Sequence, residues 1–183
     1  MPGAIDRAAA GVKLADNEPM LPRLVFATFA LTFVAFGQTP PAASTIIPYG
    51  APISTDNAKK IAAAAVAEAR KNNWAMAISI VDPSGYLVYF ERMPDTQLGS
   101  VEVSMEKAKS AALFRRPTKS FQDTVAAGGD GLRMLKLTGA VPVEGGIPII
   151  VDGKLIGAIG ASGGTSDQDG KTAQAGVASI TTK

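Results

Sequence analysis

The sequence predicts an α+β domain in which a single antiparallel sheet of about five strands is built from two hairpins and flanked by helices. Two observations carry this prediction. The run IVDPSGYLVYF (80–90) has an echo in IVDGKLIGAIG (150–160), and each run passes through a glycine turn into a second apolar stretch. Segments with helical spacing lie before, between and after these hairpins, so the strands come in antiparallel pairs rather than in β-α-β units.

The helical segments have recognisable ends. Ser54 or Thr55 can cap the first, Thr118 can cap the third, and Pro117 stops the second because proline cannot continue a helix. Thr165 or Ser166 can open the last. The expected helices span residues 55–72, 100–114, 118–127 and 165 onward.

The first hairpin joins AMAISIVD (75–82) to YLVYFERM (86–93). The second is EGGIPIIVDGKLIGAIGASGG (144–164), in which Asp152-Gly153 is typical of a tight two-residue turn. The segment LRMLKL (132–137) is compatible with a helical turn or a short strand, and its pattern does not decide between them.

The composition excludes several kinds of chemistry. The chain has 183 residues but no cysteine and no histidine, so disulfides, thiol catalysis and a Ser-His-Asp triad are excluded. A formal net charge of +2 and the lack of a long basic block predict no nucleic-acid partner.

The N-terminal part differs from the rest. Residues 24–36, LVFATFALTFVAF, carry no charge and follow Arg23. This run is shorter than the roughly 20 residues of a spanning helix, and it predicts a signal peptide at 20–37. An uncleaved anchor or a hydrophobic arm is the alternative. We therefore expect a leader and linker in residues 1–47, a domain in 48–183, a periplasmic or extracellular location, and no stable membrane span in the mature chain.

Several motifs in order resemble the GlcG/HbpS haem-binding protein family, whose domain also forms the C-terminal part of PduO-type proteins. They are IVDPSGYLVYFERM, KAKSAALFRRPTKSF, GGIPIIVDGKLIGAIGASGGTSDQD and AQAG. The resemblance covers about residues 53–181. It implies a profilin-like layered fold, haem or a related tetrapyrrole as ligand, and homo-oligomers from dimers to octamers.

The chain departs from this family at one place. Many relatives read Gly-His-Leu after the first turn, where this sequence has Gly85-Tyr86-Leu87. A bound haem iron would therefore need an oxygen or sulfur ligand, or water alone, and Tyr86 or Thr118 is the expected candidate, since phenolate ligation of haem iron is known. Alternatively, Tyr86 is a half-buried strand aromatic and Thr118 a helix cap.

Cations gather around the second expected helix and its end. Arginine holds a carboxylate through two parallel hydrogen bonds, so the cluster predicts a site for haem propionates or a small organic acid. The alternative is ordinary surface solvation and helix-end charge complementarity. The five cations are Lys107, Lys109, Arg115, Arg116 and Lys119.

The glycine-rich end of the second hairpin is a further candidate. Gly160, Ser162 and Gly163 precede a helix, and such a turn presents backbone N–H groups to an anion. Close packing of a helix against bare strand ends is the alternative. Asp167 and Asp169 would complement the dipole of that helix, or act as paired carboxylates.

Three functions remain open from the sequence. The first is an exported oligomeric protein that binds haem or a similar tetrapyrrole. The second is an enzyme that acts on a small carboxylate or hydroxy acid, with Asp169, Glu91 or Tyr86 as the proton-transfer group. The third is an assembly or sensory module. Whether the chain turns over a substrate is not decided.

Overall fold

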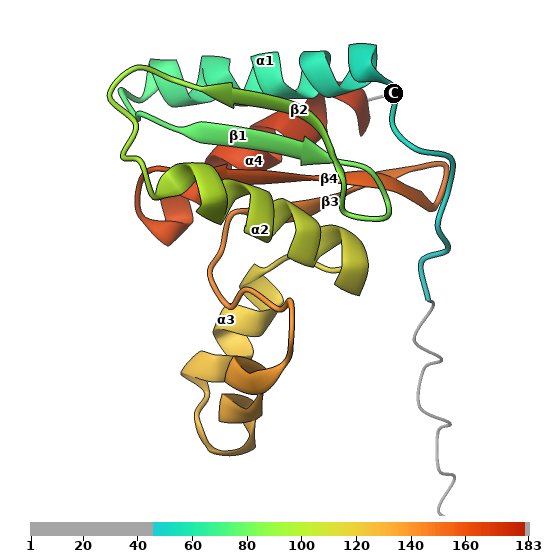
Figure 1. The fold of residues 1–183 in the computed structure, drawn as a ribbon, viewed down its shortest axis with the longest axis vertical. Helices are drawn as coiled ribbons and strands as arrows, with labels where there is room; N and C mark the ends of the chain where they lie inside the picture. Colours follow the sequence, from blue (N-terminus) through green and yellow to red (C-terminus); the bar gives the residue numbers. More distant parts are fainter. Residues whose placement is uncertain (1–45, 182–183) are drawn as a thin grey trace, which may run out of the picture. The chain divides into compact units, whose positions relative to one another are not determined.

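The computed structural model describes residues 46–181, and the expected signal peptide at 20–37 lies outside them. In the described part, one antiparallel sheet carries helices on both faces (Figure 1). The strand order is β2-β1-β4-β3. The α+β prediction is confirmed, with four strands rather than about five. The strands are β1 (Ala77–Val81), β2 (Leu87–Arg92), β3 (Gly146–Val151) and β4 (Lys154–Ser162).

A fifth strand is reduced to a single bridge. Tyr49 pairs in parallel with Leu155 of β4, and Gly50 N–H donates to the Leu155 carbonyl at 2.7 Å. The chain then leaves the sheet and enters the first helix. Residues 48–50 are thus fastened along one end of β4.

The two Ile-Val-Asp runs end β1 and β3, which lie on either side of β4. Both strands are antiparallel to β4, so their turns lie at the same end of the sheet. In the first turn, Asp82 Oδ1 accepts hydrogen bonds from the amides of Ser84 and Tyr86 at 2.8 and 2.9 Å. In the second, Asp152 and Gly153 both have positive φ, as a two-residue hairpin turn of the primed type requires.

Helices α1 (Thr55–Lys71) and α4 (Ser166–Thr181) cover one face of the sheet (Figure 1). Ser54 Oγ accepts a hydrogen bond from the Asn57 amide at 3.3 Å, so the expected cap of the first helix is confirmed. The inner face of α1 is largely alanine, which lets α4 approach closely. With Ile78 and Ile80 of β1, these helices form the larger apolar cluster. Among the described residues, every helix falls short of the length and apolar character that a bilayer crossing demands.

Helix α2 (Ser100–Phe114) covers the other face. Val101 and Met105 of this helix are only half-buried, because small and polar side chains take the positions against the sheet. Ser104 Oγ lies 2.7 Å from Ser79 Oγ of β1, which satisfies both buried hydroxyls. The buried residues of α2 are Ser100, Ser104, Lys107, Ala108, Ser110, Ala111 and Ala112.

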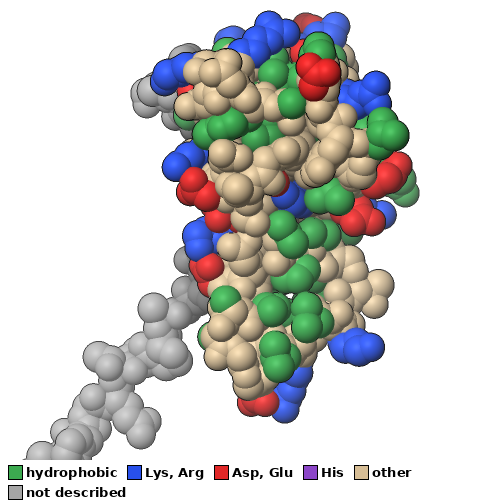
Figure 2. Space-filling model, turned by 90° about the vertical axis from the view of Figure 1, so that its left-hand side faces the viewer, with side chains coloured by type: hydrophobic (Ala, Val, Ile, Leu, Met, Phe, Trp, Pro, Cys, Tyr) green, Lys and Arg blue, Asp and Glu red, His purple; other side chains and the backbone are tan. Residues whose placement is uncertain are grey.

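Between α2 and β3 the chain forms a lobe that extends away from the sheet (Figure 1). It contains α3 (Lys119–Ala126) and the 3₁₀ helix η1 (Gly129–Lys136). The undecided LRMLKL segment is therefore helical over most of its length. Leu132 and Leu135 remain 50% and 59% exposed, and Figure 2 shows hydrophobic side chains gathered over this lobe.

Gly160 is expected to be intolerant of any side chain. A Cβ there would overlap the Ser104 carbonyl oxygen and lie 2.6 Å from the Ala108 nitrogen of α2. We expect Gly160→Ala to lower the free energy of unfolding by about 1–3 kcal/mol through overpacking. Gly99→Ala is the matched control, because a Cβ at Gly99 meets nothing within 4 Å, and its effect should stay within about 0.5 kcal/mol. Urea unfolding of both variants measures this, and equal losses would contradict the packing argument.

Candidate functional site

Two hydrogen bonds join the start of α3 to the start of β3. The Thr118 amide donates to the Gly146 carbonyl at 2.9 Å, and the Gly146 amide donates to Thr118 Oγ1 at 2.9 Å. Thr118 stands at the N-cap position, but its side chain caps no amide of α3. The expected N-cap position is therefore confirmed, but the side-chain hydrogen bond of a cap is not made. Its hydroxyl is fully buried and accepts from the Gly146 amide, so Thr118 lines none of the hollows described below.

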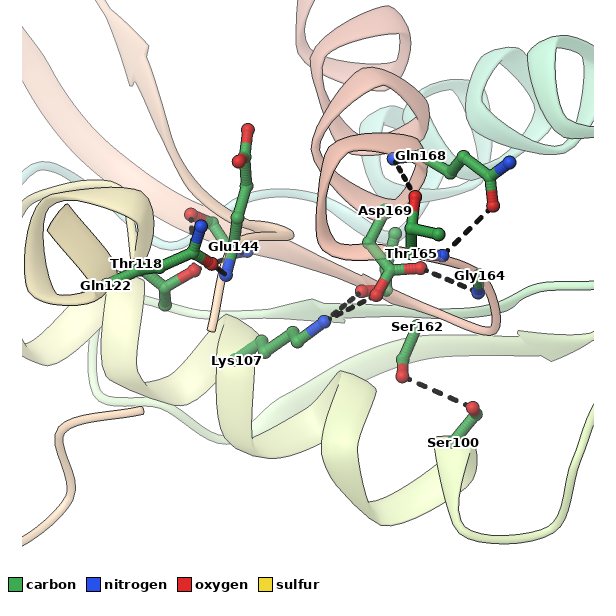
Figure 3. Close-up of polar contacts among 12 residues, drawn as sticks. Ser100, Lys107, Thr118, Gln122, Glu144, Ser162, Gly164, Thr165, Gln168 and Asp169 are labelled. Atoms are coloured by element: carbon green, nitrogen blue, oxygen red, sulfur yellow. Dashed lines mark hydrogen bonds and ion pairs between the residues drawn. The ribbon is translucent and has the colours of Figure 1, made fainter. Parts of the chain in front are cut away.

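A buried ion pair lies beside this junction. Lys107 Nζ of α2 is 2.7 Å from Asp169 Oδ2 of α4, and the side chains are 1% and 4% exposed. Lys107 also donates to the Ala161 carbonyl of β4 at 3.2 Å, and Asp169 Oδ1 accepts from the Gly164 amide at 3.0 Å (Figure 3). A Cβ on Gly145 would lie 3.0 Å from Lys107 Nζ and 2.9 Å from Asp169 Cβ. The ion pair therefore lies directly against Gly145, just before β3, where the chain has no side chain.

Sequence reasoning missed this pair. It counted Lys107 among surface cations and interpreted Asp169 as a helix-dipole acid or a catalytic candidate. The signal that could have revealed the burial of Lys107 is its spacing along the helix. It lies three residues after Ser104 and four before Ala111, and this spacing places it on the buried face of α2. A lysine at such a position requires a buried partner.

Burial raises the pKa of Asp169 above that of an ordinary aspartate. Desolvation of the carboxylate is the largest cause, and the hydrogen bonds from Lys107 and the Gly164 amide act in the opposite direction. The net direction is upward. The site thus holds a carboxyl group that takes up a proton more readily when folded.

One hollow opens beside the Thr118–Gly146 junction, where α3, β3 and α4 meet, and we call it the Glu144 hollow. Its volume is about 330 Å³, near the lower end of the range for small-molecule sites. It combines charged and apolar walls. Its lining residues are Pro117, Lys119, Glu144, Gly145, Gly146, Ile147, Gly170, Lys171 and Gln174.

A second hollow, the hairpin-turn hollow, lies at the first β-turn and has a volume of about 510 Å³. Tyr49 forms one wall, and its hydroxyl donates to the Leu113 carbonyl at 3.0 Å. The Arg115 guanidinium stacks 5.0 Å from the Tyr49 ring centroid and donates to the Ile47 carbonyl at 3.1 Å. The lining residues are Tyr49, Gly50, Pro52, Pro83, Ser84 and Leu113.

Tyr86 belongs to the same turn as Pro83 and Ser84. Its side chain is 74% exposed, so the expectation of a half-buried strand aromatic is wrong, and it precedes β2 rather than lying within it. Lys109 packs against this turn, since a Cβ on Gly85 would lie 2.9 Å from Lys109 Cγ. Lys109 also lines a third hollow of about 280 Å³ with Glu106, Gly139, Ala140 and Val141.

The five predicted cations do not form one patch. Lys107 is buried, Arg115 stacks on Tyr49, and Arg116 stacks 5.6 Å from the Phe121 ring centroid. Lys119 pairs with Asp123 within α3 at 2.6 Å. Lys107 and Lys109 are two residues apart on α2 and lie on different sides of that helix, and the chain then turns sharply at Arg115, whose φ is +52°.

The glycine-rich strand end serves packing. Gly160 lies under α2, and Ser162 Oγ donates to Ser100 Oγ at 3.2 Å. A Cβ on Gly163 would overlap the Ala75 carbonyl. None of the three lines the hollows described above. Within residues 46–181, no cluster of three or more aspartates and glutamates could hold a metal ion.

The described part of the chain is a small α+β domain on one open antiparallel sheet with shallow hollows at its rim. The family model for haem-degrading HbpS-like proteins matches residues 53–178, and the chain belongs to this family. Protein GlcG of Escherichia coli (strain K12) is 40% identical over 110 residues, which cover 60% of this chain and 81% of GlcG.

Solved structures show the same fold. Klebsiella pneumoniae protein ORFY has a TM-score of 0.67 at 30% identity, with 73% of this chain and 94% of ORFY covered. The PduOC:heme complex has a TM-score of 0.64 at 32% identity, with 71% of this chain and 96% of PduOC covered. The resemblance to the GlcG/HbpS family is thereby confirmed.

Removing one partner of the buried pair should cost more than removing both charges. Lys107→Met leaves the Asp169 carboxylate buried without its cation, and we expect a loss of about 3–5 kcal/mol in the free energy of unfolding. The double variant Lys107→Met/Asp169→Asn keeps an acceptor for the Gly164 amide without the charge, so it should recover part of that loss. Chemical denaturation measures the free energy of unfolding of both variants, and a double variant less stable than Lys107→Met would contradict the prediction.

The raised pKa of Asp169 predicts a pH dependence. A carboxyl group with a raised folded pKa binds its proton more tightly in the folded than in the unfolded chain. Its contribution to stability therefore falls as pH rises from the ordinary value of 3.8 through the folded pKa, and is level above it. The stability of the wild type minus that of Asp169→Asn should decrease across this window. Denaturation at a series of pH values checks it, and a difference that grows with pH would refute the assignment.

Proposed function

We propose that the chain binds haem or a related tetrapyrrole at the hairpin-turn hollow. Membership in the HbpS-like family and the fold shared with the PduOC:heme complex support a haem ligand. The observation that carries this location is an exposed phenol, Tyr86, in the turn whose Pro83 and Ser84 line an open hollow.

The residues around this hollow fit a haem. Pro52, Pro83 and Leu113 provide apolar walls for a flat macrocycle. The chain has no histidine and no cysteine, so two common haem-iron ligands are absent, and phenolate is an established alternative. When bound, the haem would supply an iron centre that Tyr86 holds.

Two cations nearby suit the haem carboxylates. Arg115 stacks on the Tyr49 wall, and Lys109 packs against the turn that carries Tyr86. A guanidinium matches the geometry of a carboxylate through paired N–H donors. We assign the propionates to Arg115 and Lys109, and we favour Tyr86 over the buried Thr118 as the iron ligand.

We also propose that the mature chain is exported and forms a homo-oligomer, from a dimer to an octamer. The charge-free run at residues 24–36 supports a secretory signal and hence a periplasmic or extracellular location. The hairpin-turn hollow is open to solvent, and a second copy of the chain would cover the exposed side of a haem. Light scattering of the mature chain with and without haemin measures this assembly.

Haemin titration of the purified chain tests the proposed function. We expect a shifted Soret band that saturates with haemin, and a changed band with affinity weaker by about tenfold in Tyr86→Phe. The matched control is Tyr89→Phe, because Tyr89 lies in β2 and its hydroxyl donates to Glu91 at 3.2 Å. The control should bind as the wild type does. A wild type without a Soret shift would overturn haem binding, and equal spectra for all three chains would overturn the role of Tyr86.

A further inference from the structure

The Glu144 hollow contains a carboxylate that makes no hydrogen bond or ion pair in the part of the chain that the structure describes. The neighbouring lysines pair with aspartates instead, whereas the Glu144 backbone amide donates to Gln122 Oε1 at 2.8 Å. In Figure 3 its carboxylate points away from Thr118 and Gln122. A half-buried carboxylate in this position can accept hydrogen bonds from a bound molecule.

The position of this carboxylate is set by the fold. A Cβ on Gly170 of α4 would overlap Glu144 Oε1 and lie 2.8 Å from its Cγ and Cδ. The side chain therefore lies directly on the bare surface of the helix. The backbone bond to Gln122 of α3 holds the other end of the residue. Glu144 is thus held between two helices rather than free in solvent.

Two lysines flank Glu144, and each has an aspartate partner on its own helix. Lys119 Nζ is 2.6 Å from Asp123, and Lys171 Nζ is 2.7 Å from Asp167. Those bonds are the first cause of the raised pKa of both lysines, and the charge of Glu144 adds to it in each case. Both side chains are more than half exposed, so they can turn toward a ligand carboxylate while Glu144 accepts from a cationic group.

The remaining walls are apolar. Pro117 and Ile147 lie on the lining, and the hollow of about 330 Å³ is small for a macrocycle but suited to a compact molecule. A ligand that complements all these groups carries an ammonium group for Glu144, a carboxylate for a lysine and an aliphatic body for the apolar walls. We propose that the Glu144 hollow binds an aliphatic α-amino acid, with its ammonium at Glu144, its carboxylate at Lys171 or Lys119, and its side chain against Pro117 and Ile147.

Isothermal titration of the full chain with three probes tests this site. The probes are L-leucine, 4-methylpentanoate, which lacks the ammonium, and 3-methylbutylamine, which lacks the carboxylate. We expect L-leucine to bind with a Kd at or below about 1 mM and each analogue to bind about tenfold more weakly. No heat from L-leucine, or equal affinity for all three probes, would overturn the proposal.

Variants assign each charge to its residue. Glu144→Gln should bind L-leucine no better than 4-methylpentanoate, and Lys171→Gln combined with Lys119→Gln should bind it no better than 3-methylbutylamine. Glu102→Gln and Lys60→Gln are matched controls, because both residues are exposed on other helices, and they should keep the wild-type preference. A Glu144→Gln chain that still prefers L-leucine would refute the site. Haemin binding at the other hollow has no bearing on the outcome.

Discussion

One buried ion pair connects the helical layers on the two faces of the sheet. Lys107 extends from α2, Asp169 extends from α4, and Lys107 also bonds to Ala161 of β4. Attraction between two buried charges is strong only when their remaining hydrogen bonds are made, and the Gly164 amide supplies one of these. The start of β3 can pass the pair only because Gly145 has no side chain there. Both the Thr118 junction and the Glu144 hollow adjoin this point.

The two similar hairpins differ because their second strands occupy different places. β2 is at the edge of the sheet, where aromatic side chains such as Tyr89 and Phe90 are half-buried and pack against limited neighbours. β4 is central and covered on both faces by helices. A side chain has no room where α2 comes closest to β4, so position 160 is a glycine. The repeated Ile-Val-Asp segment therefore precedes a half-buried edge strand in one hairpin and a central strand covered on both faces in the other.

Sequence periodicity was sufficient for the layered fold, because turns, caps and apolar spacing are local signals. It gave the bounds of residues 100–114 and the Asp152-Gly153 turn correctly. It could not show that Lys107 and Asp169 meet, since they are 62 residues apart and only packing brings them together. It grouped cations by their closeness in sequence, whereas the helical spacing within α2 and the turn at Arg115 send them to different surfaces. The unpaired state of Glu144 likewise depends on three elements converging.

The paired hydrogen bonds between Thr118 and Gly146 close the base of the α3–η1 lobe. The segment starts at Thr118, after α2, and returns to the sheet at Gly146, so its two ends are held together and its closure entropy grows only slowly with its length. Related chains can therefore lengthen, shorten or exchange this lobe at little thermodynamic cost, while the sheet and its helices stay unchanged. We therefore expect the binding surfaces of related chains to differ mainly at the α3–η1 lobe.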